Sequence, residues 1–541
     1  MAERKKESFV TGAAVLTAST VIIKILGAVF KIPLSNIIGK SAMGDFGVAY
    51  NIYALLLTLS TAGLPVALSR MVSAADALGR RNQVRRTFVV ARAAFFVLGM
   101  TSTLFMLIFS RYLADFMGSP DAEAAISVLA PALVCVCLMS AYRGYTQGLG
   151  NMVPTSVSQI IETLCKVIFG LSAAWLLIHR GKSGSVGAAG GIFGVTVGTV
   201  LGLVYIVPAT LRMDRKQGHP SPSPDVPESR GETLKKLILI GVPIIIGSCV
   251  LNLVAMVDTK MIFGRLQSAL GYSYETARAL YGTYFNSQTL YNLPSAFAVP
   301  MVTSAIPAIA AYAAAKKTKD AAQVLGASLK LMNLLAMPMA VGMGVLAAPL
   351  MGGLYGDTDP AAGAILSVLS AAGYGVCIMM VTNAILQAYG YERLPILTIA
   401  AGGVCKIAVN YVLLGNPEVN IVGAAAGNVA CYLVISLLNL LLIRRKAPDC
   451  PKLLPLFLRP LLASLLMGGC AWGIYTVLRS VLRSAGLFQS GRMVFLVPAV
   501  LAVLAGVVLY LVFIVVLRAI TREELELVPK GDKLARILRV R

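Results

Sequence analysis

Long apolar segments alternate with short polar loops from one end of the chain to the other. A helix of about 20 residues crosses the hydrocarbon core of a bilayer. Within hydrocarbon, backbone N–H and C=O groups must bond inside their own segment, so runs of this length form helices. The pattern predicts an all-α integral membrane protein with about 14 transmembrane helices. These segments run approximately over 9–33, 45–70, 87–110, 122–148, 155–178, 187–211, 236–258, 281–310, 326–352, 361–389, 395–415, 420–443, 457–478 and 493–517.

Composition and charge agree with this prediction. Of the 541 residues, 57% are apolar and 13% are charged, against about 25% charged in soluble domains. A water-soluble enzyme is therefore excluded. The net charge of +23 would indicate nucleic acid binding in a soluble protein. Here the basic residues lie mainly between the apolar segments, so we expect no nucleic acid partner.

The distribution of Lys and Arg predicts the orientation. With the N-terminus inside, the cytoplasmic segments contain roughly three times as many basic residues as the outer loops. Both termini are therefore expected in the cytoplasm. The basic tail is expected to lie on the membrane surface, where anionic lipids attract it.

The two halves of the chain are similar in sequence. Gln147, Gly150, Cys165 and Lys166 each recur as the same residue type 240 positions later. Because six spans are an even number, the halves have parallel topology, with a pseudo-axis along the membrane normal. We expect an N-terminal six-helix lobe at 1–211, a cytoplasmic linker at 212–236, a C-terminal six-helix lobe at 237–443, two extra transmembrane helices at 444–517 and the basic cytoplasmic tail at 518–541.

Charged residues within the first two spans are the first candidates for a binding site, because charge inside a membrane is costly and marks function. Lys24 and Lys31 are seven residues apart, which places them on one face of the first helix. Asp45, at the start of the second span, is their candidate partner or a gate. The alternative is that Lys31 extends to the headgroups and Lys24 pairs with an acid.

The fourth and fifth spans carry more polar residues at one-turn spacing. Arg143 and Gln147 share a face, as do Glu162 and Lys166. An intrahelical Glu162–Lys166 ion pair and a binding role are both open for the second pair. Polar faces at corresponding places in two halves would line a cavity, and a basic cavity suits an anion such as a lipid diphosphate. The corresponding residues of the second half are Asn383, Gln387 and Lys406.

The eighth span is polar for its position, with Asn286 and Gln288 as candidates for hydrogen bonds to glycan hydroxyls. Tyr281, Tyr284 and Tyr291 are interpreted as an interfacial belt in preference to a sugar-stacking platform.

Motifs for enzymatic chemistry are missing from the sequence. There is no GxSxG or HExxH, and GKS at 181–183 lacks the preceding glycine of a phosphate-binding loop. The nine cysteines contain no CxxC pair and the two histidines lie in loops, so they predict neither a metal site nor a cofactor. Coupling to the membrane potential or to a monovalent cation remains open.

Three segments carry a resemblance to a known family: KILGAVFKIPLSNIIGKSAMGDFGVAYNIY (24–53), YRGYTQGLGNMVPTSVSQIIE (142–162) and TNAILQAYGYERLP (382–395). Through them the chain resembles the lipid-linked oligosaccharide flippases of the multidrug/oligosaccharidyl-lipid/polysaccharide exporter superfamily. Within it, the chain is similar to the group of stage V sporulation protein B and polysaccharide biosynthesis proteins, relatives of the MurJ lipid II flippases.

The resemblance implies a two-lobed MATE/MurJ-like transporter in the bacterial plasma membrane. It would move an undecaprenyl-diphosphate-linked sugar outward by alternating access, as a monomer, with the prenyl tail in a groove of the last two helices. Lys24, Lys31 and Asp45 match positions at which MurJ-type proteins keep basic residues and an aspartate. Lysine would bind diphosphate as a point charge without bidentate geometry.

Two other functions are compatible with such a chain. A drug/cation antiporter of the same superfamily would usually have an acid-rich cavity. A membrane-embedded glycan ligase or polymerase would usually need a large outer loop, and the longest one expected here covers only residues 259–280. The sequence leaves open which glycan is carried, which energy source is used, and whether the role is vegetative or in sporulation.

Overall fold

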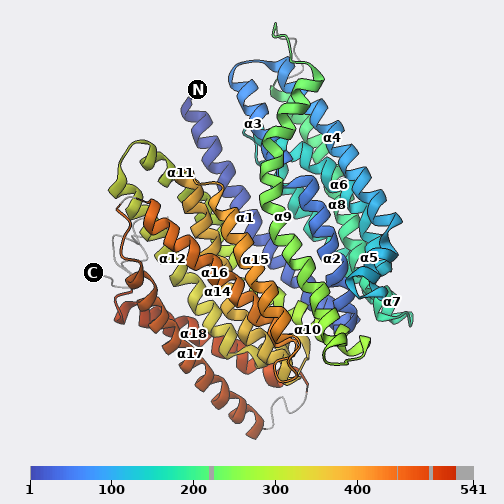
Figure 1. Ribbon diagram of the computed structural model, residues 1–541, viewed down its shortest axis with the longest axis vertical. Helices are drawn as coiled ribbons and strands as arrows, with labels where there is room; N and C mark the ends of the chain where they lie inside the picture. Colours follow the sequence, from blue (N-terminus) through green and yellow to red (C-terminus); the bar gives the residue numbers. More distant parts are fainter. Residues whose placement is uncertain (1, 218–223, 448, 486–490, 520–541) are drawn as a thin grey trace. The chain divides into compact units, whose positions relative to one another are not determined.

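The computed structural model describes residues 2–217, 224–447, 449–485 and 491–519 (Figure 1). Over these residues the chain is helical, with no strand. The expected basic tail at 518–541 lies almost wholly outside the described residues. Contacts divide the chain into two compact units, residues 1–285 and 286–541.

Among its described residues, the first unit contains ten helices and a 3₁₀ turn, and the tenth helix ends just beyond the unit. The bounds are α1 (Ala2–Ile38), α2 (Lys40–Thr61), α3 (Leu64–Ala77), α4 (Arg81–Ile108), α5 (Ser110–Met117), η1 (Pro120–Ala122), α6 (Glu123–Gly148), α7 (Val153–His179), α8 (Gly184–Gln217), α9 (Arg230–Ser268) and α10 (Tyr274–Tyr291).

Within this unit α8 packs along both α6 and α7, while α4 packs on α6 and α1 on α7 (Figure 1). Glycine permits the closest of these contacts. A Cβ added at Gly194 of α8 would lie 2.3 Å from the backbone of Gly170 in α7. Membrane helices gain van der Waals packing when small residues let their backbones approach in this way.

The second unit holds the remaining helices: α11 (Ser295–Ala314), α12 (Thr318–Val345), α13 (Ala347–Tyr355), α14 (Pro360–Ala388), α15 (Leu394–Leu413), α16 (Val422–Lys446), α17 (Leu453–Ser484) and α18 (Met493–Val516). Here α16 packs on α14 and α15, and α17 packs on α12 and α18. Its main core lies among α11, α12 and α14 and includes Leu325, Leu329, Met332 and Ile385.

The structure confirms an all-α protein of membrane-spanning helices. Thirteen candidate spans occur among the described residues. The predicted eighth span, 281–310, is not one of them, because it consists of α10 and α11 with a turn between them. The outer loop expected at 259–280 is also wrong, since α9 continues to Ser268 and α10 begins at Tyr274. Polar residues in these helices made the region look like a loop.

The predicted lobes and the observed units follow different criteria. The sequence repeat divides the chain at the linker 212–236, whereas contacts divide it after Phe285. The reason is that α9, which follows the linker, packs against α2, α3 and α4. The lobe boundaries drawn from the repeat therefore stay a prediction.

The linker is anchored at its second half. The two carboxylate oxygens of Asp225 accept hydrogen bonds from the backbone N–H groups of Asn82 and Gln83, each at 3.0 Å. These N–H groups belong to the first turn of α4, where no intrahelical partner exists. Gln83 Oε1 in turn accepts from the backbone N–H of Glu228 at 2.7 Å. Asp225 thus caps α4 from a distant part of the chain.

We predict that Asp225→Ala lowers the stability of the detergent-solubilised protein by about 1 kcal/mol, the usual cost of losing a helix N-cap. Thermal unfolding followed by circular dichroism would measure it. Asp225→Asn, which keeps one acceptor, should lie between Asp225→Ala and the parent. The exposed Glu392 provides a control, and equal melting temperatures for Asp225→Ala and Glu392→Ala would contradict the cap.

Candidate functional site

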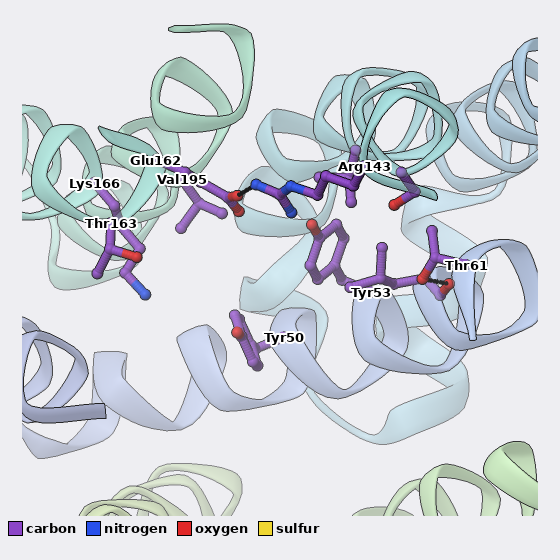
Figure 2. Close-up of a pocket in the computed structure, with 11 residues that line it drawn as sticks. Tyr50, Tyr53, Thr61, Arg143, Glu162, Thr163, Lys166 and Val195 are labelled. Atoms are coloured by element: carbon purple, nitrogen blue, oxygen red, sulfur yellow. Dashed lines mark hydrogen bonds and ion pairs between the residues drawn. The ribbon is translucent and has the colours of Figure 1, made fainter. Parts of the chain in front are cut away.

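A polar cavity of about 250 Å³ lies within the first unit. It is bounded by residues of α2, α6, α7 and α8 (Figure 2). Its polar side chains include two tyrosines, three hydroxyl residues, two cations and one carboxylate. The lining consists of Tyr50, Tyr53, Leu57, Thr61, Val136, Ser140, Arg143, Glu162, Thr163, Lys166 and Val195.

Arg143 and Glu162 form an ion pair across this cavity. Arg143 Nη2 lies 2.9 Å from Glu162 Oε2 (Figure 2). Arg143 Nε donates to the hydroxyl of Ser158 at 3.0 Å. The partner of Glu162 is therefore Arg143 on α6. The alternative of an intrahelical Glu162–Lys166 pair is not what the structure shows.

Lys166 is a cation on the cavity wall with an aromatic neighbour. Its ammonium lies 5.1 Å from the centre of the Phe30 ring, within the range of a cation–π interaction. Among the described residues, no carboxylate lies within ion-pair distance of it. In Figure 2 the Lys166 side chain extends from α7 towards α2, which carries Tyr50, another residue of the cavity lining.

Aromatic rings extend from the cavity to Lys31. Phe46 packs on Phe30 and stacks on Tyr50, with ring centres 6.1 and 5.9 Å apart. The Lys31 ammonium lies 5.5 Å from the Tyr50 ring centre and 4.5 Å from that of Phe285. Two helices, α1 and α7, thus bring Lys31 and Lys166 to one aromatic cluster.

Two other predicted residues of this unit lie apart from the cavity lining. Lys24 is exposed on α1. Gln147, near the end of α6, donates to the hydroxyl of Thr155 at a long 3.4 Å. The structure therefore brings together Lys31, Arg143 and Lys166, and leaves Lys24 and Gln147 outside the group.

Asp45 belongs to a different cluster, around a residue that sequence reasoning missed. Its carboxylate is fully buried and pairs with Arg278 of α10, whose Nε donates to Oδ1 at 3.0 Å. Ser119 donates to the same oxygen at 3.1 Å. Arg278 also contacts Ser185 at 2.6 Å and Asp121 at 3.0 Å. Arg278 lies in the outer loop predicted at 259–280 and was therefore not a candidate. The acid Glu275, three positions earlier, is nevertheless typical of an ion pair on a helix.

The predicted residues of the second half lie in another setting. Asn383 Oδ1 accepts from Asn439 at 2.7 Å, and Asn439 also bonds Thr382 at 3.0 Å and Thr398 at 2.8 Å. This network is buried and uncharged. Lys406 is buried with 5% of its surface exposed, whereas Gln387 is exposed. None of the three predicted residues lines the two apolar cavities of this unit.

The residues of the predicted eighth span are mostly internal. Asn286 is buried and Gln288 is half-buried. Tyr281 and Tyr284 are each 1% exposed and Tyr291 is 5% exposed. Tyr281 lies 3.1 Å from the Thr259 hydroxyl, and Tyr284 donates to Asp258 at 2.9 Å. The interfacial-belt interpretation was wrong, because all three side chains are buried and the hydroxyls of Tyr281 and Tyr284 bond side chains inside the protein.

The chain is a multi-pass membrane protein, and its fold is similar to that of two solved transporters, one of which belongs to the MOP superfamily. The lipid II flippase MurJ in an inward closed conformation aligns with a TM-score of 0.68 and 15% identity, covering 92% of this chain and 98% of MurJ. An inward-facing MATE multidrug transporter of that superfamily aligns with a TM-score of 0.62 and 16% identity, covering 81% of this chain and 100% of the transporter.

Sequence comparison gives the family. Residues 9–313 match the family described as polysaccharide biosynthesis protein, and the chain belongs to it. The membrane protein YabM of Bacillus subtilis is 28% identical over 98% of this chain and 96% of its own length. The lipid II flippase MurJ of the same organism is 26% identical over 92% of this chain and 94% of its own length.

We predict that Arg278→Gln destabilises the protein by about 3–5 kcal/mol, because it leaves the Asp45 carboxylate buried without a counter-charge. The double variant Asp45→Asn/Arg278→Gln should recover part of this loss, since both charges are removed. Thermal denaturation of the solubilised protein, monitored by size-exclusion chromatography, would measure both. Equal melting temperatures for the single and double variants would show that the pair is not coupled.

Proposed function

We propose that the protein is a flippase that moves an undecaprenyl-diphosphate-linked sugar from the inner to the outer leaflet of the bacterial plasma membrane. The substrate class includes lipid II and precursors of cell-wall or capsule polysaccharides. The proposal draws on the family of the chain and on its similarity to a lipid II flippase over most of both sequences.

The observation that carries the proposal is the group of cations within apolar spans. Arg143 and Lys166 line the cavity, Lys31 lies beside the same aromatic cluster, and only Glu162 offsets their charge among the residues lining the cavity. Positive charge inside a membrane is retained where it binds something. A diphosphate on a lipid carrier supplies the matching negative charge, and Arg143 can hold it in bidentate fashion.

The mechanism we propose is alternating access. The cavity receives the diphosphate from the cytoplasmic side, and rearrangement of the helices then exposes the sugar to the outer side while the prenyl chain stays in lipid. Lys24, Asp45 and Gln147, with Asn286, Gln288, Asn383, Gln387 and Lys406, are proposed to contact or gate the substrate at other stages. The membrane potential supplies about 2.3 kcal/mol per charge per 100 mV to such a cationic carrier.

We predict that Lys166→Gln and Lys31→Gln each lower the flipping rate at least tenfold, because a charge-assisted hydrogen bond contributes about 1.5–3 kcal/mol. The measurement is headgroup accessibility of lipid II, and of other prenyl-diphosphate sugars, in proteoliposomes. Lys260→Gln is the matched control: Lys260 also lies over an aromatic ring, that of Phe116, but lines a different pocket.

Wild-type rates in both Lys166→Gln and Lys31→Gln would overturn the assignment of this cavity. Transport of organic cations without flipping of any prenyl-diphosphate sugar would instead identify a drug/cation antiporter.

The orientation is a further part of the proposal: both termini lie in the cytoplasm. A green fluorescent protein fused after Arg541 should therefore fluoresce, and an alkaline phosphatase fused there should be inactive, since each folds on one side of the membrane only. At Ser183, in the predicted outer loop between α7 and α8, a fused green fluorescent protein should not fluoresce and a fused alkaline phosphatase should be active. Active phosphatase at the C-terminus would refute this topology.

A further inference from the structure

Both partners of the Arg143–Glu162 ion pair line the cavity. The two residues come from α6 and α7, and these helices pack far less on each other than each packs on α8. The side chains are 13% and 25% exposed, and both line the cavity. Their separation therefore needs no repacking of two helices.

Arg143 has a second anchor that does not depend on Glu162. Its Nε donates to Ser158 at 3.0 Å, and the Ser158 hydroxyl donates to the backbone oxygen of Thr155 at 2.8 Å. The serine therefore fixes the guanidinium at one edge, while the Nη2 edge bonds the carboxylate. If the carboxylate left, the guanidinium would still be oriented, with this edge free for another anion.

Glu162 also has a second cation, Lys166, within reach of its carboxylate. Lys166 follows it by one turn on α7, and no described carboxylate lies within ion-pair distance of the Lys166 ammonium. Glutamate placed four residues before lysine is the favourable order for a helical ion pair. The carboxylate can thus exchange one cation for another by a side-chain rotation within the cavity.

We infer that Glu162 is an internal ligand of the cavity: it occupies Arg143 while the site is empty, and an entering diphosphate displaces it towards Lys166, whose three N–H donors are then shared between the carboxylate and the diphosphate. The inference rests on the proposed function and deepens it. In the empty state, the carboxylate of Glu162 balances the positive charge of the Arg143 guanidinium, which would otherwise lie in an apolar span without a counter-charge. After transport, its return to Arg143 competes with the diphosphate and promotes release, so Glu162 sets the affinity of the site.

The test measures binding of inorganic pyrophosphate to the full-length purified protein by isothermal titration calorimetry. Removing the competing charge with Glu162→Gln should tighten pyrophosphate binding roughly twofold to fivefold, the effect expected of a partly exposed ion pair. Arg143→Gln should abolish the binding. Glu123→Gln is the matched control, because Glu123 is an exposed acid on the same helix as Arg143 and its loss changes the net charge equally.

Unchanged or weaker binding in Glu162→Gln, or no binding to either protein, would overturn the inference and leave a purely structural pair. A gain matched by Glu123→Gln would also overturn it, since net charge alone would explain it. The flipping assay separates this result from the proposed function. Tighter pyrophosphate binding in Glu162→Gln without flipping by the parent protein would refute the flippase alone. Flipping by the parent with unchanged affinity in Glu162→Gln would refute the internal ligand alone.

Discussion

Positive charge held within apolar helices is the constraint on which the rest of this structure depends. An ammonium or guanidinium inside a membrane span loses most of its hydration, and the protein must replace it. The first unit does so in two ways. Arg143 receives a carboxylate and a hydroxyl, while Lys31 and Lys166 receive aromatic faces. An aromatic face offsets only part of a buried charge, and the proposed function assigns the remainder to the anionic substrate.

Arg278 differs from Arg143 and Lys166 in how many of its donors are bonded within the protein. Arg278 is 7% exposed and contacts Asp45, Asp121, Ser185 and Glu275, which joins residues of α2, η1, α8 and α10. Nearly every donor of its guanidinium is used by the protein. Arg143, at a cavity wall, uses fewer of its donors, and Lys166 uses an aromatic ring. Arg278 and Arg143 are the same type of residue, and they differ in the number of partners that the protein provides for the guanidinium.

The sequence was enough to predict the helices but only part of the site. Hydrophobic length decides whether a segment spans, because hydrocarbon tolerates no unpaired backbone, so most spans were correct. The division of the eighth span at Asn292–Pro294 and the helical ends of α9 and α10 depend on tertiary contacts of polar residues such as Asp258 and Tyr284. One-turn spacing correctly grouped Glu162 with Lys166 on one face, yet the partner of Glu162 came from α6, which no spacing within α7 could indicate.

The two halves of the chain have similar helical patterns, but the polar residues at matched positions differ. Arg143 and Asn383 occupy corresponding positions 240 residues apart. Arg143 bonds a carboxylate beside a polar cavity, whereas Asn383 bonds Asn439 in a buried neutral network. A neutral amide network satisfies its own donors and acceptors and gains stability from doing so. At the matched position of the first half, Arg143 brings a charge, and Glu162, whose counterpart 240 residues later is Gly402, supplies the carboxylate that pairs with it. The two halves therefore differ at more than one matched position, and the sequence combines a guanidinium with a carboxylate in the first half alone.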